Sequence, residues 1–327
     1  MKANKALYIS KSKSIHDERF VEAFSEVTSL DEIYLDETGP LFESGIFDQR
    51  DLIIASPLTT GLSSIPSTTN ARIFGICMAY EINEDSKDSI VSQEISRNVQ
   101  RCTAIICDCR QIQKELTNRF NFKGPILNIA YGCNQQDFLD IEFKNQEVLR
   151  IISTRSWTQI HSNETSLQAL ELAKHHGLKF KVRYFGAEIL LTEEIKSKYI
   201  EKFENDVSFL GLYSQADLPT IMSQSEVYVS TSLSDGTSVS LLEAMSAGRI
   251  CVVRDFPSNR EWINHGINGF LFTSIKDLSE VLISISNLSF QDKLQISNEA
   301  KLSVKLRGDW IEMRKTLIEF AKRWIIK

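Results

Sequence analysis

The residues best suited to chemistry lie between positions 226 and 255, where strand and helix patterns alternate. A β-branched run at 227–231 predicts a buried strand, and residues 238–245 carry apolar side chains at helical spacing. The loop between them brings Asp235 and Gly236 to the carboxyl end of the strand. In open α/β sheets this is the edge where ligands bind.

The start of the predicted helix is suited to binding an anion. The first backbone N–H groups of a helix have no partner within it and lie at the positive end of its dipole. Those of Thr237, Ser238 and Val239 are therefore candidates to hold a phosphate or diphosphate. Glu243, eight residues after Asp235, adds a carboxylate that can accept hydrogen bonds from paired hydroxyls, such as those of a ribose.

A purely structural interpretation of the same residues is equally open on spacing alone. Ser240 and Glu243 have the spacing of a capping box, in which the Glu carboxylate would satisfy the backbone and not a ligand. The pair Asp235 and Gly236 is also common in turns.

The segment SDGTSVSLLEAMSAG, followed by DFPSNREWINHGINGFLF, resembles the donor-site signature of the retaining glycosyltransferases of family 4 (group 1). In that signature two acidic residues are separated by seven others, and here they are Asp235 and Glu243. The family more often has Glu at the first position, so Asp235 shortens the reach toward the donor sugar by one methylene. The resemblance runs from about Thr103 to the end and is strongest over 207–272.

The resemblance implies an α/β protein of the GT-B fold, with two Rossmann-like parallel-sheet domains facing a cleft. Residues 1–145 would form the acceptor domain and 146–308 the nucleotide-sugar donor domain, while a C-terminal helix at 309–327 would cross back to the first domain. A length of 327 residues favours two domains independently. The linker is expected at 131–146, where strand pattern is poor.

Alternating strand and helix patterns on both sides of that linker favour parallel βαβ units. The expected strands are 6–9, 32–35, 51–55, 72–78, 103–107, 126–129, 148–153, 179–185, 207–210, 227–231, 250–253 and 269–272. The expected helices are 16–26, 110–120, 165–175, 193–202, 217–223, 238–245, 260–264, 275–285, 289–302 and 309–327.

The implied reaction moves a sugar from a nucleotide-sugar to a hydroxyl acceptor, with retention at the anomeric carbon. Arg155 and Asp235 are the implied catalytic residues. Arg155 follows the strand at 148–153 and matches the family's Gly-Arg element, where its guanidinium would stabilise the departing diphosphate. Asp235 would hold the donor sugar's hydroxyls. A UDP-sugar is favoured over a GDP-sugar, and no cofactor is expected.

Further donor contacts follow from the same resemblance. Gly186 resembles the family's turn after a strand, and backbone groups at Leu212 would read the base edge. The family's Lys has no counterpart here except His161, Ser162 or Asn163, and a His in its place would strengthen diphosphate binding as pH falls. The implied donor-binding set is Ser156, His161, Gly186, Leu212, Gly236, Thr237, Ser238, Val239 and Glu243.

The first domain departs from the family pattern. The loop after its first strand has no Gly, and residues 79–85 contain no His, so Lys13 and His16 are the only candidate acceptor contacts. The competing hypothesis is therefore a non-enzymatic nucleotide-binding or scaffold protein that retains the fold. A nucleotide-sugar epimerase or phosphorylase on this fold is less favoured, because no acid/base or cofactor lysine stands out.

Composition excludes other classes of protein. The chain has 37 Lys and Arg against 43 Asp and Glu, a net charge of −6, which argues against a general nucleic-acid binder. No Asp-x-Asp occurs, so no metal-bridged diphosphate site is expected. Dinucleotide-binding, P-loop, zinc-protease and serine-hydrolase motifs are also missing.

The six cysteines are expected to be reduced and buried, in agreement with a cytoplasmic protein. No signal peptide or membrane span is predicted.

From Lys301 onward there are eight basic and three acidic residues, a net charge of +5. The amphipathic helix at 309–327 could lie on an anionic membrane or pack on the protein body; we favour packing, and the two can coexist. The expected setting is bacterial surface polysaccharide or glycolipid assembly at the inner face of the membrane, with a glycan or lipid-linked acceptor.

Overall fold

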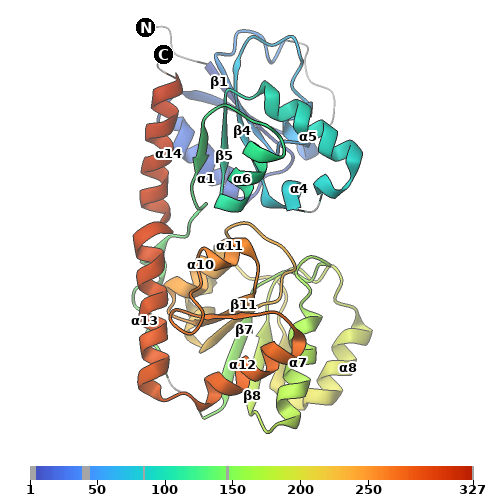
Figure 1. Cartoon of the computed structure of the whole chain (residues 1–327), viewed down its shortest axis with the longest axis vertical. Coiled ribbons are helices and arrows are strands. Elements are labelled where there is room, and N and C mark those ends of the chain that lie inside the picture. The colour runs from blue at the N-terminus through green and yellow to red at the C-terminus, as the bar shows by residue number, and fades with distance from the viewer. Residues whose placement is uncertain (1–4, 39–44, 84, 145–146, 326–327) are drawn as a thin grey trace. The chain divides into compact units, whose positions relative to one another are not determined.

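The computed structural model describes residues 5–38, 45–83, 85–144 and 147–325. The chain divides into two compact units, residues 1–131 with 310–327, and residues 132–309. Each unit contains a six-stranded sheet flanked by helices (Figure 1), so the predicted α/β fold with two parallel sheets is confirmed. The division falls at the start of the predicted linker; residues 145–146 of that linker lie outside the described residues.

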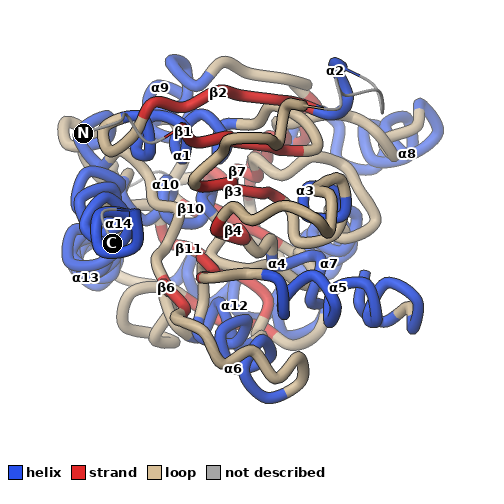
Figure 2. The backbone as a smooth tube through the Cα atoms, turned by 90° about the horizontal axis from the view of Figure 1, so that it is seen from above, coloured by secondary structure: helices blue, strands red, loops and turns tan. Residues whose placement is uncertain are grey.

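The first sheet has the strand order β2-β1-β3-β4-β5-β6, and every neighbouring pair is parallel. Figure 2 shows β2, β1, β3 and β4 side by side. The central strands are continuous apolar runs, as expected for strands covered on both faces. The strands are β1 (Lys5–Ser10), β2 (Ser29–Tyr34), β3 (Leu52–Ser56), β4 (Arg72–Ile76), β5 (Ala104–Cys107) and β6 (Ile126–Asn128).

The C-terminal helix α14 (Trp310–Ile325) packs into the first unit. Leu317 and Ala321 on its apolar stripe are fully buried, and the ring of Phe320 lies 6.0 Å from that of Phe74 in β4. The apolar face of this helix therefore covers protein, as favoured from the sequence. The other helices of this unit are α1 (Ile15–Ser25), α2 (Leu35–Thr38), α3 (Thr60–Ser63), α4 (Ala79–Asn83), α5 (Ser89–Arg101) and α6 (Arg110–Asn118).

Helix α5 was not predicted. Its sequence is mostly polar, but Ile95 and Val99 are fully buried at a spacing of one helical turn. Asp88 caps its start by accepting hydrogen bonds from the N–H groups of Ile90 and Val91. This cap and the apolar spacing together are the signal that could have identified the helix.

The second sheet has the strand order β12-β11-β10-β7-β8-β9 and is also parallel throughout. The chain builds outward from β7 to β9 and then returns to place β10 on the other side of β7. Such a reversal leaves a crevice at the carboxyl ends of β7 and β10. The strands are β7 (Leu149–Ser153), β8 (Phe180–Tyr184), β9 (Val207–Phe209), β10 (Val227–Ser230), β11 (Ile250–Arg254) and β12 (Phe270–Phe272).

The predicted helix at 260–264 is wrong. Helix α11 instead occupies Pro257–Arg260, because Pro257 fits the first turn of a helix, and the chain turns after Arg260. The other helices of this unit are α7 (Glu164–His175), α8 (Glu193–Phe203), α9 (Leu218–Ser223), α10 (Val239–Ser246), α12 (Ile275–Asn287) and α13 (Phe290–Arg307), with short 3-10 turns η2 (Gln135–Phe138), η3 (Glu204–Asp206) and η4 (Gln215–Asp217).

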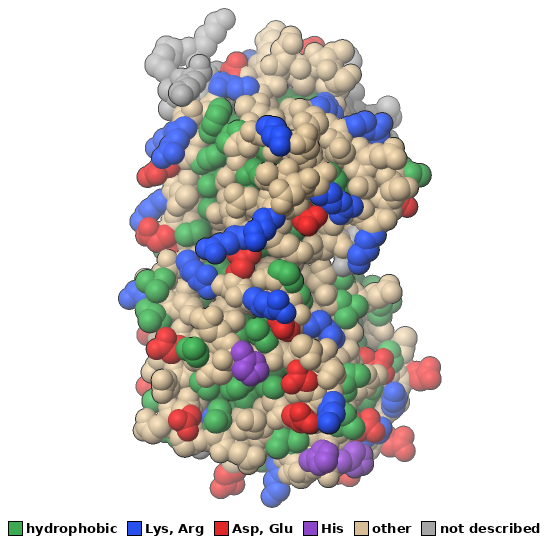
Figure 3. Space-filling view, viewed as in Figure 1, with side chains coloured by type: hydrophobic (Ala, Val, Ile, Leu, Met, Phe, Trp, Pro, Cys, Tyr) green, Lys and Arg blue, Asp and Glu red, His purple; other side chains and the backbone are tan. Residues whose placement is uncertain are grey.

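All six cysteines are buried and none forms a disulfide within the described residues, as predicted. Among the described residues no helix combines the length and apolar character of a membrane span. On the face shown in Figure 3, basic and acidic side chains are interspersed, so no single-sign field covers it. Lys327, counted in the basic tail, lies outside the described residues.

Candidate active site

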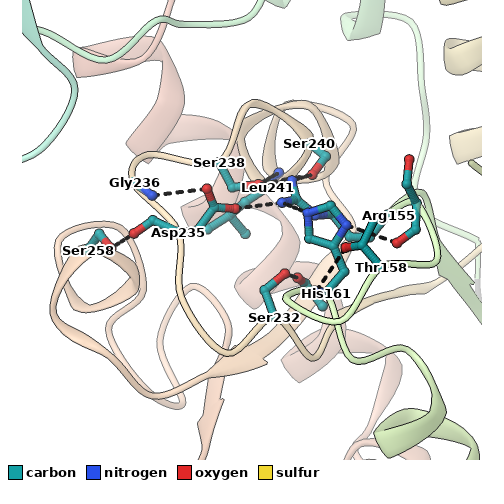
Figure 4. Close-up of polar contacts among 12 residues, drawn as sticks. Arg155, Thr158, His161, Ser232, Asp235, Gly236, Ser238, Ser240, Leu241 and Ser258 are labelled. Carbon is teal, nitrogen blue, oxygen red and sulfur yellow. Dashed lines mark hydrogen bonds and ion pairs between the residues drawn. The ribbon is translucent and has the colours of Figure 1, made fainter. Parts of the chain in front are cut away.

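Arg155 is the centre of a polar cluster at the carboxyl ends of β7 and β10. Its Nη1 donates to the hydroxyls of Ser238 and Ser240, both at 3.0 Å, and its Nη2 donates to Oδ2 of Asp235 at 2.8 Å. Figure 4 shows these side chains converging on the guanidinium from the loop after β10 and the start of α10. The two predicted catalytic residues are thus in direct contact across adjacent strands.

The loop that carries Arg155 is fixed by side-chain bonds to its backbone. Asn163 donates from Nδ2 to the carbonyls of Arg155 and Ser156, at 2.9 and 3.0 Å. Thr231, just after β10, donates to the carbonyls of His161 and Ser162, at 3.1 and 2.9 Å. These bonds join the β7 and β10 loops and determine where the guanidinium lies.

Gly186 lies against the same loop at the end of β8. Its φ of +115° is unfavourable for other residues, and a Cβ there would come within 2.8 Å of the Ser156 nitrogen. Gly186 is therefore required for the approach of the β8 loop to Ser156. Its N–H donates to the carbonyl of Gly211 at 2.7 Å, next to Leu212, whose side chain is exposed.

His161 contacts the same guanidinium nitrogen, Nη2, as Asp235 does. Its Nδ1 lies 2.9 Å from the carbonyl of Ser156 and its Nε2 lies 2.7 Å from Nη2 of Arg155. A neutral ring that donates from Nδ1 and accepts at Nε2 satisfies both contacts. Burial, and then the charge of Arg155, lower the pKa of His161 from 6.5 to about 4, so the ring is neutral at pH 7.

Asp235 is held by its own loop. Its Oδ1 accepts from the N–H of Gly236 at 2.9 Å, and its backbone carbonyl accepts from the hydroxyl of Ser258 in α11 at 2.7 Å. Its side chain is 24% exposed. A carboxylate has about four acceptor positions, so Asp235 can accept from further hydroxyls without losing Arg155.

The start of α10 differs from the capping-box interpretation. Ser238, and not Ser240, is the N-cap, and its hydroxyl accepts from the N–H of Leu241. Glu243 therefore lies beyond the capping position, where it is 5% exposed and accepts from Nε2 of Gln215 at 2.7 Å. Thr237 is also buried, and its hydroxyl accepts from Nε1 of Trp262 at 3.2 Å. Val239 is the first residue of the helix.

Four residues hold this cluster in roles that sequence reasoning did not assign: Asn163 was considered only as a counterpart of the family's Lys, Ser240 only as a capping residue, and Tyr228 and Gln215 had no role. Ser240 bonds Arg155 and accepts from the hydroxyl of Tyr228 at 2.9 Å, Gln215 bonds Glu243, and Asn163 fixes the Arg155 loop. Ser240 was visible as a polar residue in the first turn of an otherwise apolar helix. Nothing local to Gln215 or Tyr228 indicates a role, because their partners lie 28 and 12 residues away.

The two candidate acceptor residues belong to the first unit. Lys13 lies 3.9 Å from Glu18 and 5.9 Å from the centre of the Tyr34 ring. The ring of His16 packs 5.5 Å from that of Tyr131. Both side chains thus have neighbours within their own unit.

Comparison with protein families matches residues 151–287 to the model described as glycosyl transferases group 1. This segment contains Arg155, His161, Gly186, Asp235 and Glu243, so the group 1 resemblance is supported where the polar cluster lies.

Two curated relatives match shorter segments. The chain is 31% identical over 124 residues to glycosyltransferase 1 domain-containing protein 1 of Xenopus tropicalis. It is 33% identical over 101 residues to the GtfA subunit of the UDP-N-acetylglucosamine–peptide N-acetylglucosaminyltransferase of Streptococcus pneumoniae. These matches cover 37% and 31% of this chain, and only 34% and 19% of the relatives' lengths.

Solved structures match nearly the whole chain. The Anabaena protein Alr3699/HepE, solved with UDP and glucose, superimposes with a TM-score of 0.77 and 15% identity, covering 98% of this chain and 100% of that one. Sucrose-phosphate synthase of Thermosynechococcus elongatus gives a TM-score of 0.78 at 10% identity, covering 99% of each chain. At such identities these likenesses establish the GT-B fold only.

Proposed function

We propose that this chain is a group 1 glycosyltransferase that transfers a sugar from a nucleotide-sugar to a hydroxyl acceptor with retention, without a metal ion or other cofactor. One observation carries the proposal: the family match over 151–287 contains a cluster in which Arg155, Asp235 and the start of α10 converge. A cation, a helix N-terminus and a carboxylate are what a diphosphate-linked sugar requires.

The roles follow from the positions. The guanidinium of Arg155 and the amides of residues 237–239 would stabilise the departing diphosphate, and Asp235 would hold hydroxyls of the donor sugar. Glu243 would give up the hydrogen bond from Gln215 and accept hydrogen bonds from the ribose hydroxyls instead. Backbone groups at Leu212, next to Gly211, would contact the base. Residues 132–309 would then be the donor unit and the first unit the acceptor unit.

Donor binding must change the partners of Arg155. Its four terminal N–H groups are occupied by Asp235, His161 and two serine hydroxyls. A phosphate oxygen forms a stronger, charge-assisted bond than a neutral hydroxyl does. We expect the diphosphate to displace Ser238 and Ser240 from Nη1 while Asp235 keeps Nη2, which would place the sugar's hydroxyls beside the leaving group.

We favour a UDP-sugar as donor. HepE was solved with UDP and glucose, and a GtfA structure with UDP and GlcNAc has a TM-score of 0.68 over 84% of this chain. The proposed acceptor is a glycan or lipid-linked sugar in bacterial surface polysaccharide or glycolipid assembly, and the proposed location is the cytoplasmic face of the membrane.

The test is nucleotide-induced stabilisation followed by donor turnover. UDP, GDP and ADP, each with its sugar conjugates, are added to wild type, Arg155→Ala and Glu243→Ala in a thermal-shift assay. A ligand at about 100 times its dissociation constant adds about 2.7 kcal/mol, so one nucleotide should raise the midpoint of wild type and of neither variant. No shift with any of them in a folded wild type would contradict the donor site.

A binding protein without transfer is the second candidate, because the family match does not extend before residue 151. Release of free nucleotide from the donor, with acceptor present, separates the two. Nucleotide binding without turnover across a broad acceptor set would favour the binding protein. Products that are epimers or sugar phosphates would indicate the epimerase or phosphorylase alternative.

We also propose a peripheral membrane contact through the basic face of α14. Leu317 and Ala321 of its apolar stripe are buried, whereas Lys322 and Arg323 are exposed and could face an anionic surface. In a sedimentation assay, more wild type than Lys322→Ser/Arg323→Ser should pellet with vesicles that contain anionic lipid. Neither protein should pellet with neutral vesicles. Equal sedimentation of both proteins with anionic vesicles would contradict this contact.

A further inference from the structure

Outside the candidate active site, the second unit has a hollow of about 320 Å³ over β7, β8 and β9. Arg150 of β7 pairs in register with Lys181 of β8, and Arg183 of β8 pairs with Ser208 of β9. Because side chains alternate between the faces of a strand, these four residues point to the same face. All four line the hollow, and Gln224, after α9, lines it as well.

The hollow is lined by more cations than carboxylates. Among the described residues, Arg150 and Lys181 form no ion pair, and Arg183 bonds neutral acceptors of Gln224, Ile221 and Ser225. One carboxylate, Asp206, lines the hollow, and it pairs with Lys174 at 3.7 Å. Three cations therefore share one small space in a chain whose net charge is −6.

Arg183 is fixed in this place. Its Nη2 donates to the carbonyl of Ile221 at 3.1 Å and to the hydroxyl of Ser225 at 3.3 Å, and its guanidinium lies 5.7 Å from the centre of the Phe185 ring. Burial, and then the charge of Arg150, lower its pKa. The two guanidinium groups thus repel each other, and an anion between them would relieve that repulsion.

This hollow is separate from the polar cluster around Arg155. Arg150 is the second residue of β7, whereas Arg155 follows the carboxyl end of that strand. The three residue steps of strand from Arg150 to Ser153, at ~3.3 Å each, already span roughly 10 Å before the loop of Arg155 begins. A ligand of the hollow would therefore not compete directly with a ligand at Arg155.

We propose that the hollow over β7, β8 and β9 is a binding site for a small phosphorylated molecule. A guanidinium group can bind two oxygens of one phosphate at once through parallel N–H bonds. The Lys181 ammonium and the Ser208 hydroxyl add hydrogen-bond donors, which can rotate toward the rest of the ligand. Its volume is at the lower end of small-molecule sites, which span about 300 to 1,000 Å³. That is room for a phosphate with a sugar-sized group. The inference does not depend on the proposed transferase activity.

Calorimetric titration with pyrophosphate tests this site. The variants are Arg150→Ser/Lys181→Ser, the charge-matched control Lys276→Ser/Lys305→Ser on exposed helix positions, and Arg155→Ala. Loss of two charge-assisted contacts should weaken one binding event roughly tenfold or more in the first variant. The control should keep wild-type binding, and Arg155→Ala should keep this event. Lys181→Ser alone, at an exposed position, should show a smaller loss.

Equal pyrophosphate binding by Arg150→Ser/Lys181→Ser and by the control would overturn the proposal. UDP titrations separate this outcome from the proposed function: the UDP binding event assigned to the Arg155 cluster should disappear in Arg155→Ala and persist in Arg150→Ser/Lys181→Ser. If wild type binds pyrophosphate at the hollow and shows no UDP binding event that depends on Arg155, the proposed function fails and the site stands.

Discussion

His161 shows how a single residue changes the character of the site. The family resemblance places a Lys near this position, and a His in its place was expected to lose that permanent charge; in the structure the ring is neutral and accepts a hydrogen bond from Arg155. Within the described part of the chain, Arg155 is then the sole cation of the cluster that holds Asp235 and Ser238. A diphosphate brings negative charge beside His161, which should raise its pKa and favour the protonated ring.

We expect UDP affinity to increase as pH falls, and more steeply in wild type than in His161→Asn. The complex binds a proton that the free protein does not bind until about pH 4, so protonation and UDP binding assist each other. The titration of the UDP phosphate affects both proteins equally, so it does not contribute to the difference between their pH dependences. Dissociation constants at pH 5 and 7.5 provide the measurement; equal slopes for the two proteins would show that His161 takes up no proton.

The same residue predicts a pH dependence of stability without ligand. The folded pKa of His161, about 4, lies below its ordinary value, so the unfolded chain binds more protons between pH 6.5 and 4, and stability falls as pH falls through that window. Its partial exposure reduces the effect to roughly 1 to 2 kcal/mol. Glu81 changes stability with pH in the opposite direction. Burial raises its pKa to about 7, so its contribution to the free energy of unfolding is lost as pH rises.

Urea unfolding at pH 4.5 and 7 measures this contribution, since Glu81 acts equally in wild type and in His161→Asn. Wild type should lose more stability on acidification than the variant does. An identical loss in both proteins would show that the pKa of His161 is not lowered in the fold.

At the scale of elements, the site depends on loops that approach one another closely. The β7 loop is held by Asn163 and Thr231, and the β8 loop reaches it only because Gly186 has no side chain. Gly177, also in a left-handed conformation, has open space around it. Alanine substitutions at these two glycines therefore distinguish the effect of backbone strain, which both would have, from the effect of close approach, which only Gly186 would have.

We expect Gly186→Ala to weaken UDP binding strongly and Gly177→Ala to leave it unchanged. Both changes strain a positive φ, at a cost of about 1 kcal/mol each, but only the methyl group at position 186 meets the Ser156 nitrogen, at 2.8 Å. The Arg155 loop must then move. Calorimetric UDP titration and thermal unfolding of both variants provide the check; equal UDP affinity would show that the β8 loop does not position the site.

Sequence predicted most strands and the Asp235 to Glu243 motif because their signals are local. Continuous apolar runs mark the buried strands, and the Asp-Gly loop precedes an apolar helix within a few residues. The partners of Arg155 could not be predicted in the same way, because Asp235 and Ser240 lie 80 and 85 positions away. The neutral state of His161 depends on burial and on Arg155, neither of which a sequence pattern contains.

At the scale of the whole molecule, the two units have separate cores. One includes Ile53, Ile105 and Leu116, and the other includes Ile151, Val229 and Leu278. Chains with separate cores can unfold in more than one step. Helix α14 contributes Leu317 and Ala321 to the first unit, while the Arg155 cluster lies in the second.

We expect Leu317→Ala to lower the unfolding transition of the first unit, and UDP to raise that of the second. Leu317 is fully buried, and removing its side chain costs about 2 to 5 kcal/mol. Differential scanning calorimetry with and without UDP assigns the transitions. A matched substitution at the exposed Leu306 of α13, Leu306→Ala, should leave both nearly unchanged. If UDP and Leu317→Ala act on the same transition, the units do not unfold separately.

The return of α14 has a consequence for synthesis of the chain. The first unit is built from residues 1–131 and 310–327, with the whole of the second unit between them. A ribosome therefore completes the second unit before α14 emerges, so the later part of the chain can reach its native fold first. Until then Phe74 lacks the ring of Phe320 that packs against it, so part of the first unit's apolar surface stays uncovered on the nascent chain and open to non-native contacts.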